Sequence, residues 1–271
     1  MNSMRFSGKA AIVTGSSSGI GKGTALLLAK EGASVLIHGR NFSAIKETVA
    51  ECIKVASENA KFPYIQGDIG DDDVLKKIHD TAVETFGRID ILVNNAGYFD
   101  SDPTLSSGSI KLYDDTSKIL LRAPLLLSQM CLPELKQCKG NIVNISSNLG
   151  VLASDGCPFY CIAKAGLNMF TQCAALEFGG QGVRVNAVCP GLSKGTRVLK
   201  SQGVPEAVEE TRYSVLEKCS PLGKIGNVEN AAKLIAFLAS EDASMINGSC
   251  VVSDGGTTLT GLDNKTFMLH L

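Results

Sequence analysis

Tyr160 and Lys164 are the residues of this 271-residue chain whose types and spacing most directly suggest chemistry. They are four positions apart, so they share one face if segment 159–178 is a helix. A free tyrosine has a pKa of about 10, too high for efficient proton exchange near neutral pH. The charge of Lys164, together with that of an oxidised nicotinamide, should favour tyrosinate and lower that pKa. The pair is therefore a candidate acid/base; the alternative is an unrelated tyrosine and lysine on a surface helix.

A glycine-rich segment, TGSSSGIG at 14–21, follows a strand-like run and opens a helical one. Gly15 permits a sharp turn, Gly19 lets the backbone approach a pyrophosphate, and Gly21 lets the helix pack closely. The helix start adds unpaired N–H groups and a positive dipole end. The segment predicts a dinucleotide-phosphate site, rather than a merely structural turn, formed by Gly15, Ser17, Ser18, Gly19, Ile20 and Gly21.

The end of the next predicted strand, IHGRN at 37–41, bears on the choice of nucleotide. A protein that binds NAD usually presents an acidic residue there to the ribose 2′-hydroxyl. This chain has Gly39 and Arg40 instead, and a guanidinium can pair with a 2′-phosphate. NADP(H) is therefore the preferred cofactor and NAD(H) a possible one, unless Arg40 is only a solvated surface charge.

Short β-branched runs alternate with longer helical segments along the whole chain, which predicts βαβ units and a parallel sheet covered by helices on both faces. The strands are expected at 10–15, 34–39, 62–68, 90–95, 141–146, 183–188 and 249–256, and the helices at 20–31, 43–59, 72–86, 112–130, 159–178 and 228–239. With no linker or repeat, residues 1–271 are expected to form a single domain. The irregular stretch at about 190–220 is a candidate substrate lid, or else a mobile surface insertion, and 257–271 is a C-terminal tail.

Composition and net charge bear on which classes of partner the protein binds and where it is located. The net charge is −1 with no block of like charges, which argues against nucleic acid or an anionic membrane surface as a partner. The opening residues contain no apolar run long enough for a signal peptide or a membrane span. Nine cysteines without CxxC pairs favour reduced thiols and a cytoplasmic location.

Several ordered blocks point to one family. TGSSSGIG (14–21), GDI (67–69) and NNAG (94–97) are followed by NISS (144–147), YCIAK (160–164), VNAVCPG (185–191) and SDGG (253–256). In order and spacing these blocks resemble the short-chain dehydrogenase/reductase family in its compact single-domain form, over about residues 6–256. The resemblance implies an α/β, Rossmann-type, doubly wound sheet of seven parallel strands.

The resemblance also implies site residues. Tyr160 would be the catalytic acid/base, Ser147 would hydrogen-bond the substrate oxygen, and Lys164 would hold the nicotinamide ribose, with no metal required. The residues implied along the cofactor are Asp68 and Ile69 at the adenine, Asn94, Ala96 and Gly97 after the fourth strand, and Pro190, Gly191 and Leu192 at the carboxamide. Relatives often place a threonine shortly after Pro-Gly; here Gly195 has the commonest spacing and Thr196 comes one position later.

One position departs from the family pattern. Relatives carry a catalytic asparagine that holds a water linking the active-site lysine to solvent, in a stretch resembling LRAP at 121–124. Here Leu120 stands at that position, and segment 96–140 contains no asparagine. The expected effect is reduced or altered proton relay with the proton donor retained.

The leading functional interpretation is an NADP(H)-dependent oxidoreductase acting on a small carbonyl or alcohol. The alternatives are a cofactor-binding protein with weak or no catalysis, and an enzyme whose physiological direction is NAD-dependent alcohol oxidation. The resemblance implies a homo-oligomer, a dimer or tetramer. Apolar stripes in 119–132 and 161–176 fit subunit contacts, the alternative being that both are buried within the monomer. No histidine is predicted to be catalytic, and Cys157, Cys161 and Cys189 are interpreted as packing groups.

Overall fold

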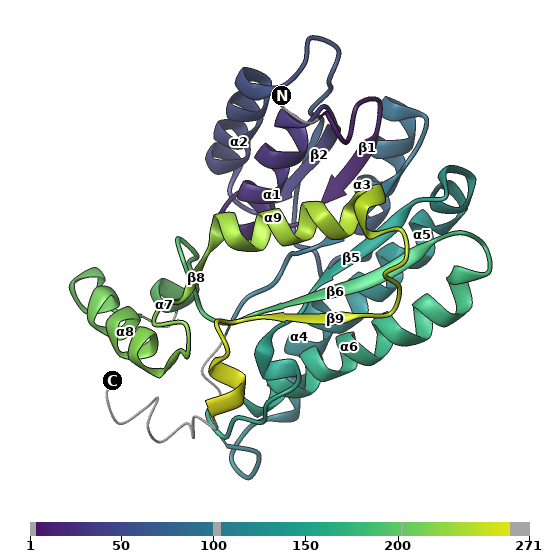
Figure 1. Ribbon diagram of the computed structural model, residues 1–271. Helices are drawn as coiled ribbons and strands as arrows, with labels where there is room; N and C mark the ends of the chain where they lie inside the picture. The colour runs from purple at the N-terminus through teal and green to yellow at the C-terminus, as the bar shows by residue number, and fades with distance from the viewer. Residues whose placement is uncertain (1–3, 100–103, 202, 261–271) are drawn as a thin grey trace.

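The computed structural model describes residues 4–99, 104–201 and 203–260. A seven-stranded parallel sheet with the order β3-β2-β1-β4-β5-β6-β9 runs through the molecule (Figure 1). This confirms the predicted Rossmann-type fold and its single domain. The strands are β1 (Ala10–Val13), β2 (Ser34–Gly39), β3 (Tyr64–Gln66), β4 (Ile91–Asn94), β5 (Asn141–Ile145), β6 (Arg184–Pro190) and β9 (Cys250–Ser253).

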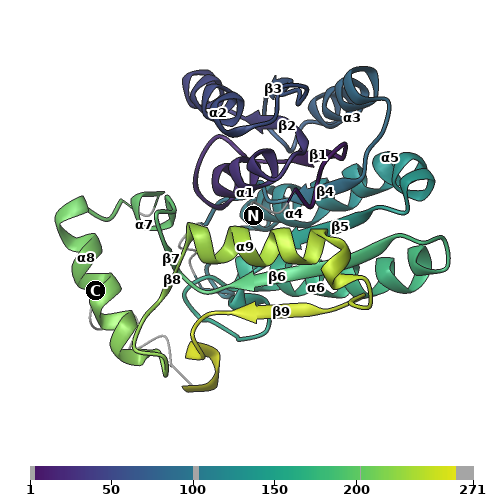
Figure 2. The same ribbon diagram turned by 45° about the horizontal axis from the view of Figure 1, so that its top comes forward.

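Helices cover both faces of the sheet (Figure 2). Successive side chains of a strand point to opposite faces, so Ile12 packs in one core and Val13 in the other. The first core contains residues of α1, α2 and α9, and the second contains residues of α3, α5 and α6. Their bounds are α1 (Gly19–Lys30), α2 (Phe42–Val55), α3 (Asp72–Phe86), α5 (Ala123–Cys138), α6 (Pro158–Gly179) and α9 (Val228–Ala239).

The helix predicted at 112–130 is divided into three parts. It comprises α4 (Ile110–Ser117), a π-helical turn η1 (Lys118–Arg122) and the beginning of α5. Pro124 has no N–H to offer the carbonyl four residues earlier, and its ring crowds that carbonyl. The Ala123 N–H accordingly bonds to the Lys118 carbonyl, one residue further back than in an α-helix.

The predicted lid region contains more regular structure than the sequence suggested. Two short parallel strands, β7 (Ser193–Lys194) and β8 (Gly226–Asn227), pair at its base. Between them lie α7 (Val198–Ser201) and α8 (Glu206–Cys219), which project beyond the carboxyl ends of the sheet (Figure 1). Of the predicted tail, 257–260 form a short helical turn, and 261–271 lie outside the described residues.

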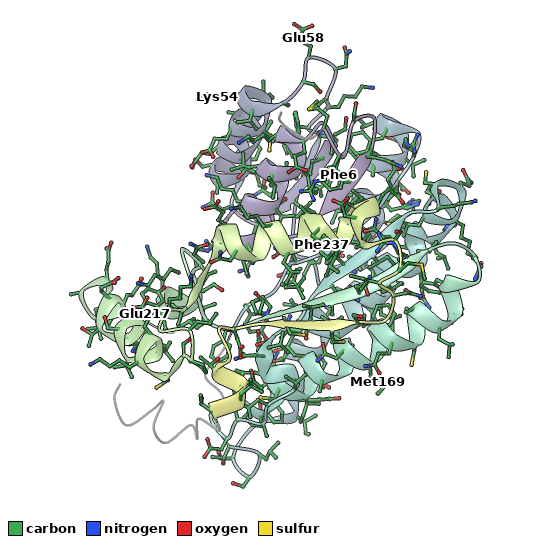
Figure 3. The ribbon with its side chains drawn as sticks, viewed as in Figure 1. Phe6, Lys54, Glu58, Met169, Glu217 and Phe237 are labelled. Atoms are coloured by element: carbon green, nitrogen blue, oxygen red, sulfur yellow. The ribbon has the colours of Figure 1, made fainter. Side chains whose placement is uncertain are left out.

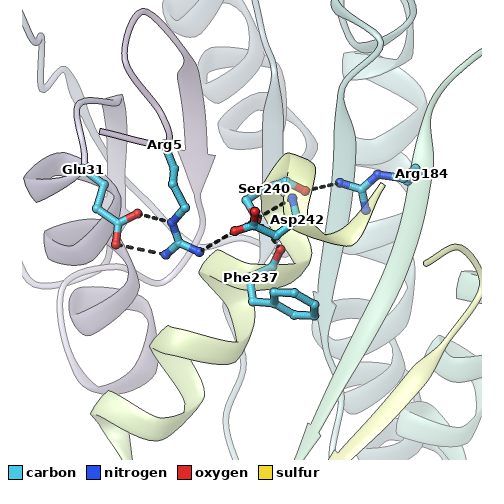
Figure 4. Close-up of polar contacts among 6 residues, drawn as sticks. All are labelled: Arg5, Glu31, Arg184, Phe237, Ser240 and Asp242. Atoms are coloured by element: carbon cyan, nitrogen blue, oxygen red, sulfur yellow. Dashed lines mark hydrogen bonds and ion pairs between the residues drawn. The ribbon is translucent and has the colours of Figure 1, made fainter. Parts of the chain in front are cut away.

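Polar groups join the N-terminal segment, the end of α1 and the turn after α9 to the start of β6 (Figure 4). The Arg5 guanidinium donates to the Glu31 carboxylate at 2.7 and 3.0 Å and reaches Asp242 at 3.4 Å. The Arg184 guanidinium donates to the Ser240 carbonyl at 3.0 Å. These contacts fix the end of α9 against α1 and β6. No helix in the described part of the chain is long and apolar enough to cross a bilayer.

Candidate active site

A cavity of about 970 Å³ opens at the carboxyl ends of the strands. It includes the point where the strand order reverses, between β1 and β4, which is the usual ligand position in open α/β sheets. Most of the predicted site residues line it: Gly15, Ser17, Ser18, Ile20, Arg40, Asp68, Ile69, Ala96, Gly97, Ser147, Tyr160, Lys164, Pro190, Gly191 and Leu192. Gly19, Gly21 and Asn94 are not part of its wall.

The glycine turn connects β1 to α1 in the conformation that the motif requires. Gly15 and Gly19 have positive φ angles of 64° and 54°, which favour glycine. A Cβ on Gly15 would lie 2.7 Å from the Cα of Ala96. A Cβ on Gly21 would lie 2.3 Å from the Asn95 amide and 2.5 Å from the Gly15 carbonyl. Gly21 therefore permits close packing of the helix on the turn itself.

Asn95 and Thr14, which the sequence analysis did not select, hold this turn against the end of β4. The Asn95 side chain donates to the carbonyls of Thr14 at 2.8 Å and Gly15 at 3.2 Å. The Thr14 hydroxyl accepts from the backbone N–H groups of Asn95 and Ala96, both at 3.0 Å. Both residues lie within the quoted blocks TGSSSGIG and NNAG, so the motifs carried the signal.

The prediction that Asn94 lies along the cofactor is not met by its side chain. Asn94 is buried behind the cavity and donates to Asn144 at 2.9 Å and to Ser128 at 3.1 Å. Asn144 in turn donates to Thr171 at 2.9 Å. The alternation of side chains along β4 directs Asn94 toward α5 and α6, and a buried amide needs such partners. Asn94 therefore joins four elements beneath the site.

The end of β2 leaves no room for an acidic residue at position 39. A Cβ on Gly39 would lie 2.4 Å from the Ser17 hydroxyl oxygen. Arg40 is exposed at the rim of the cavity, and within the described ranges it makes no ion pair with a carboxylate. This arrangement leaves a cation available beside the second strand.

Ser147, Tyr160 and Lys164 come together at the ends of β5 and α6. Lys164 is buried and its ammonium donates to the Ile145 carbonyl at 2.7 Å. The same nitrogen lies 5.7 Å from the centre of the Tyr160 ring. Ser147 caps the short helix η2 (Asn148–Gly150), its hydroxyl accepting from the Leu149 N–H at 3.1 Å. The predicted constellation is thus assembled from two elements.

Burial dominates the protonation of this site. It raises the pKa of Tyr160 above its ordinary value, while a hydrogen bond with Ser147 acts to lower it. Burial also lowers the pKa of Lys164 to about 8. The expectation that Lys164 and an oxidised nicotinamide together lower the pKa of Tyr160 concerns the cofactor-bound protein and stays a prediction.

Asp254 of the SDGG block (253–256) packs against the Pro-Gly turn that lines the cavity. Asp254 accepts hydrogen bonds from Asn148 at 3.3 Å and from Thr257 at 2.8 Å. A Cβ on Gly191 would lie 2.8 Å from the Asp254 Cβ, so the Pro-Gly turn rests directly on this residue. Gly195 has a φ of 80° and is not part of the cavity wall. Thr196, one position later, lines the cavity.

Leu120 lies in the π-helical turn and is only 1% exposed. A Cβ on Gly97 would lie 3.0 Å from its Cδ2 atom. The position where relatives carry a polar relay residue is thus filled by an apolar side chain packed below the NNAG loop.

The cavity around Tyr160 is largely apolar. The Phe99 ring meets the Tyr160 ring edge-on with centroids 4.8 Å apart. The remaining apolar wall comes from the η2 loop, the start of α6 and the lid: Leu149, Leu152, Cys157, Leu192, Val198, Leu199, Leu216 and Ile225. Residues 100–103, in the segment between β4 and α4, lie outside the described residues. Nowhere in the described ranges do three His, Cys, Asp or Glu side chains gather as a metal site would require.

The turn has the features that a dinucleotide needs. Added Cβ atoms at Gly15 and Gly21 would collide with the turn and the NNAG loop, so the backbone is compact there. Ser18, the residue before α1, and Ile20 in its first turn line the cavity, and the first N–H groups of a helix have no partner within it. A pyrophosphate placed there meets both the N–H groups and the positive end of the helix dipole.

Known proteins of similar sequence include reductases and dehydrogenases. Residues 15–258 match the protein family described as "Enoyl-(Acyl carrier protein) reductase". The chain is 36% identical over 259 residues to 3-oxoacyl-(acyl-carrier-protein) reductase FabG of Thermotoga maritima, covering 94% of this chain and 100% of that protein. It is 34% identical to meso-2,3-butanediol dehydrogenase of Serratia marcescens, covering 94% and 96%.

A solved structure is equally similar. A short-chain dehydrogenase/reductase of Caenorhabditis elegans, crystallised with cofactor, superposes with a TM-score of 0.89 at 37% identity, covering 94% of this chain and 97% of that one. Fold and site together define an oxidoreductase with a Rossmann-type NAD(P)-binding domain that acts on CH–OH or C=O groups. The chain belongs to the short-chain dehydrogenase/reductase family.

Proposed function

We propose that this chain is an NADP(H)-dependent oxidoreductase that interconverts a small, largely apolar carbonyl compound and its alcohol, with Tyr160 as the acid/base. The observation that carries the proposal is the meeting of Ser147, Tyr160 and Lys164 in the cavity that also contains the glycine turn. The similarity to FabG, named as a 3-oxoacyl-(acyl-carrier-protein) reductase, supports the direction of reduction.

The proposed chemistry assigns one task to each side chain. When bound, the nicotinamide ring supplies or takes up the hydride. During reduction Tyr160 gives its phenolic proton to the substrate oxygen, and Ser147 donates a hydrogen bond to the same oxygen. The buried ammonium of Lys164, 5.7 Å from the ring centre, stabilises the tyrosinate that remains. The hydride and this proton together convert the carbonyl to an alcohol.

The preference for NADP(H) rests on the end of β2. Ser17 occupies the space that a side chain at position 39 would need, so no carboxylate opposes a 2′-phosphate there. Arg40 can form charge-assisted hydrogen bonds with such a phosphate. Such bonds contribute about 1.5–3 kcal/mol each, which corresponds to roughly tenfold to a hundredfold in affinity.

Calorimetric titration of Arg40→Ala tests this preference. We expect NADPH binding to weaken at least about tenfold while NADH binding changes little, because only NADPH carries the 2′-phosphate. Lys233→Ala is the matched control, since Lys233 lies on α9 and pairs with Glu229 of its own helix. Equal affinity of the unmodified chain for NADH and NADPH would contradict the role of Arg40 and favour NAD-dependent alcohol oxidation.

A second candidate function has a specific observation in its favour. The burial of apolar Leu120 beneath Gly97 removes a polar group from the region of the proton relay. A cofactor-binding protein with weak or no catalysis would bind NADPH tightly and show no turnover over a broad carbonyl panel. Leu120→Asn discriminates between the two, since a gain in turnover indicates a catalytic site with an impaired relay.

A further inference from the structure

His38, at the carboxyl end of β2, lies directly beneath the glycine turn and is only 2% exposed. Three hydrogen bonds join it to that turn. The Gly15 N–H donates to its Nδ1 atom at 3.1 Å, and the Ser16 N–H donates to its carbonyl at 2.8 Å. Its own N–H donates to the Ser16 hydroxyl oxygen at 3.0 Å. Both backbone groups and one ring nitrogen of His38 are thereby committed to two consecutive turn residues.

The bond to Gly15 fixes the tautomer of the ring. Because Nδ1 accepts a backbone N–H, the proton of the neutral imidazole is on Nε2. Burial lowers the pKa of His38 to about 4, with Arg40 also lowering it and the Gly67 carbonyl and Asp68 opposing the shift. The ring is therefore neutral near pH 7, and Nδ1 is free to accept.

The opposite side of the turn is held by Asn95, whose amide donates to the Thr14 and Gly15 carbonyls. The peptide groups of 14–16 are thus bound on both sides, by β2 and by the loop after β4. The turn holds two glycines with positive φ, so an unbound turn would have large conformational freedom. Ordering such a segment only when a ligand binds weakens affinity, and holding it in advance restores it.

We propose that His38 is a positioning residue that preorganises the phosphate-binding turn, acting as a neutral Nε2–H imidazole that accepts the Gly15 N–H. This role rests on the dinucleotide site of the proposed function. It acts on the part of the turn common to NADH and NADPH, away from the 2′-phosphate. Its effect therefore differs from that of Arg40, because both nucleotides should lose affinity together.

The test uses His38→Leu and His38→Asn in the full chain, with calorimetric titration of NADPH and NADH. Leucine keeps the bulk but leaves the Gly15 N–H without an acceptor, whereas the asparagine amide oxygen occupies the place of Nδ1. We expect about tenfold weaker binding of both nucleotides by His38→Leu, and affinity within about threefold of the unmodified chain for His38→Asn. At saturating cofactor, kcat should stay within about twofold in both variants.

A spectroscopic measurement examines the ring itself without any cofactor. The ¹⁵N shifts of His38 at pH 7 should show an unprotonated Nδ1 and a protonated Nε2. A charged ring, or a proton on Nδ1, would overturn the proposal. If His38→Leu does not fold, His38→Ala removes the same acceptor without adding bulk.

The outcomes separate this inference from the proposed function. Equal nucleotide affinities in the unmodified chain and both variants, or equal weakening by leucine and asparagine, would overturn the role of His38 alone. An unmodified chain that binds neither nucleotide would overturn the proposed function and this role together.

Discussion

The protonation of two neighbouring side chains, Tyr160 and Lys164, sets what the site can do. Burial raises the pKa of Tyr160, so the protein alone holds it as a proton donor. Burial also makes the ammonium of Lys164 costly, although its bond to the Ile145 carbonyl offsets part of that cost. Lys164 is therefore a buried cation in the active site. Its burial lowers the stability of the fold, as groups kept for function often do.

Lys164→Met is expected to stabilise the fold while abolishing turnover. The pKa of Lys164 is about 8 in the folded state and its ordinary value is 10.5, a difference that corresponds to about 3 kcal/mol. At pH 7 the variant should gain about 1–3 kcal/mol in the free energy of unfolding by urea, because it avoids burying the charge.

The pH dependence provides the control for this prediction. Between about pH 8 and 10.5 the unfolded chain holds a proton on Lys164 that the folded chain has lost, so the stability of the unmodified protein rises with pH relative to the variant. The advantage of methionine should accordingly shrink across that window. A Lys164→Met variant that is less stable than the unmodified protein at every pH would refute the claim that burying the Lys164 charge costs stability.

At the scale of elements, the sequence predicted most of the sheet and missed the interruptions. Strands occur in all seven places that the β-branched runs predicted. The glycine turn and α6 bring the site residues together. The break at 118–122 was missed because the pattern of apolar residues continues through it, although Pro124 was its visible cause. The pairing of β7 with β8 joins two-residue strands far apart in the chain, and periodicity over two residues is no signal.

The outer face of α6 is an element-scale feature with a consequence for assembly. Ile162, Met169, Cys173 and Leu176 lie on the exposed side of this helix, and Leu176 is 87% exposed. Met169 extends away from the sheet in Figure 3. A contiguous apolar stripe of this kind is typical of an interaction surface. It supports the prediction of a dimer or tetramer.

Sedimentation of the double variant Met169→Glu and Leu176→Glu tests whether the apolar stripe on α6 is a subunit interface. The unmodified chain should sediment as a dimer or tetramer at micromolar concentration, and the variant should shift toward the monomer because charges cannot be buried there unpaired. Leu105→Glu, which alters an exposed leucine of a loop, is the control. A monomeric unmodified chain would show that the stripe is not an interface.

Across the whole molecule, the two ends of the sheet have separate tasks. Polar contacts from Arg5 and Arg184 fix the layers at one end (Figure 4). The carboxyl ends of the strands carry the cavity. The motif blocks predicted most residues of that cavity because every block except YCIAK, which lies in α6, is at the carboxyl end of a strand. They could not reveal His38 as a support of the turn, since His38 lies outside every block and its contact depends on how β2 approaches the turn.

Transfer of deuterium tests the central claim most directly. NADPH carrying deuterium at C4 of the nicotinamide, supplied with a broad panel of carbonyl compounds, should yield a deuterated alcohol with the unmodified chain. Tyr160→Phe should slow that transfer by about 10²–10⁴-fold, with NADPH affinity within about threefold. Absence of deuterated product from every carbonyl, or an equally fast Tyr160→Phe variant, would contradict hydride transfer with Tyr160 as the acid/base.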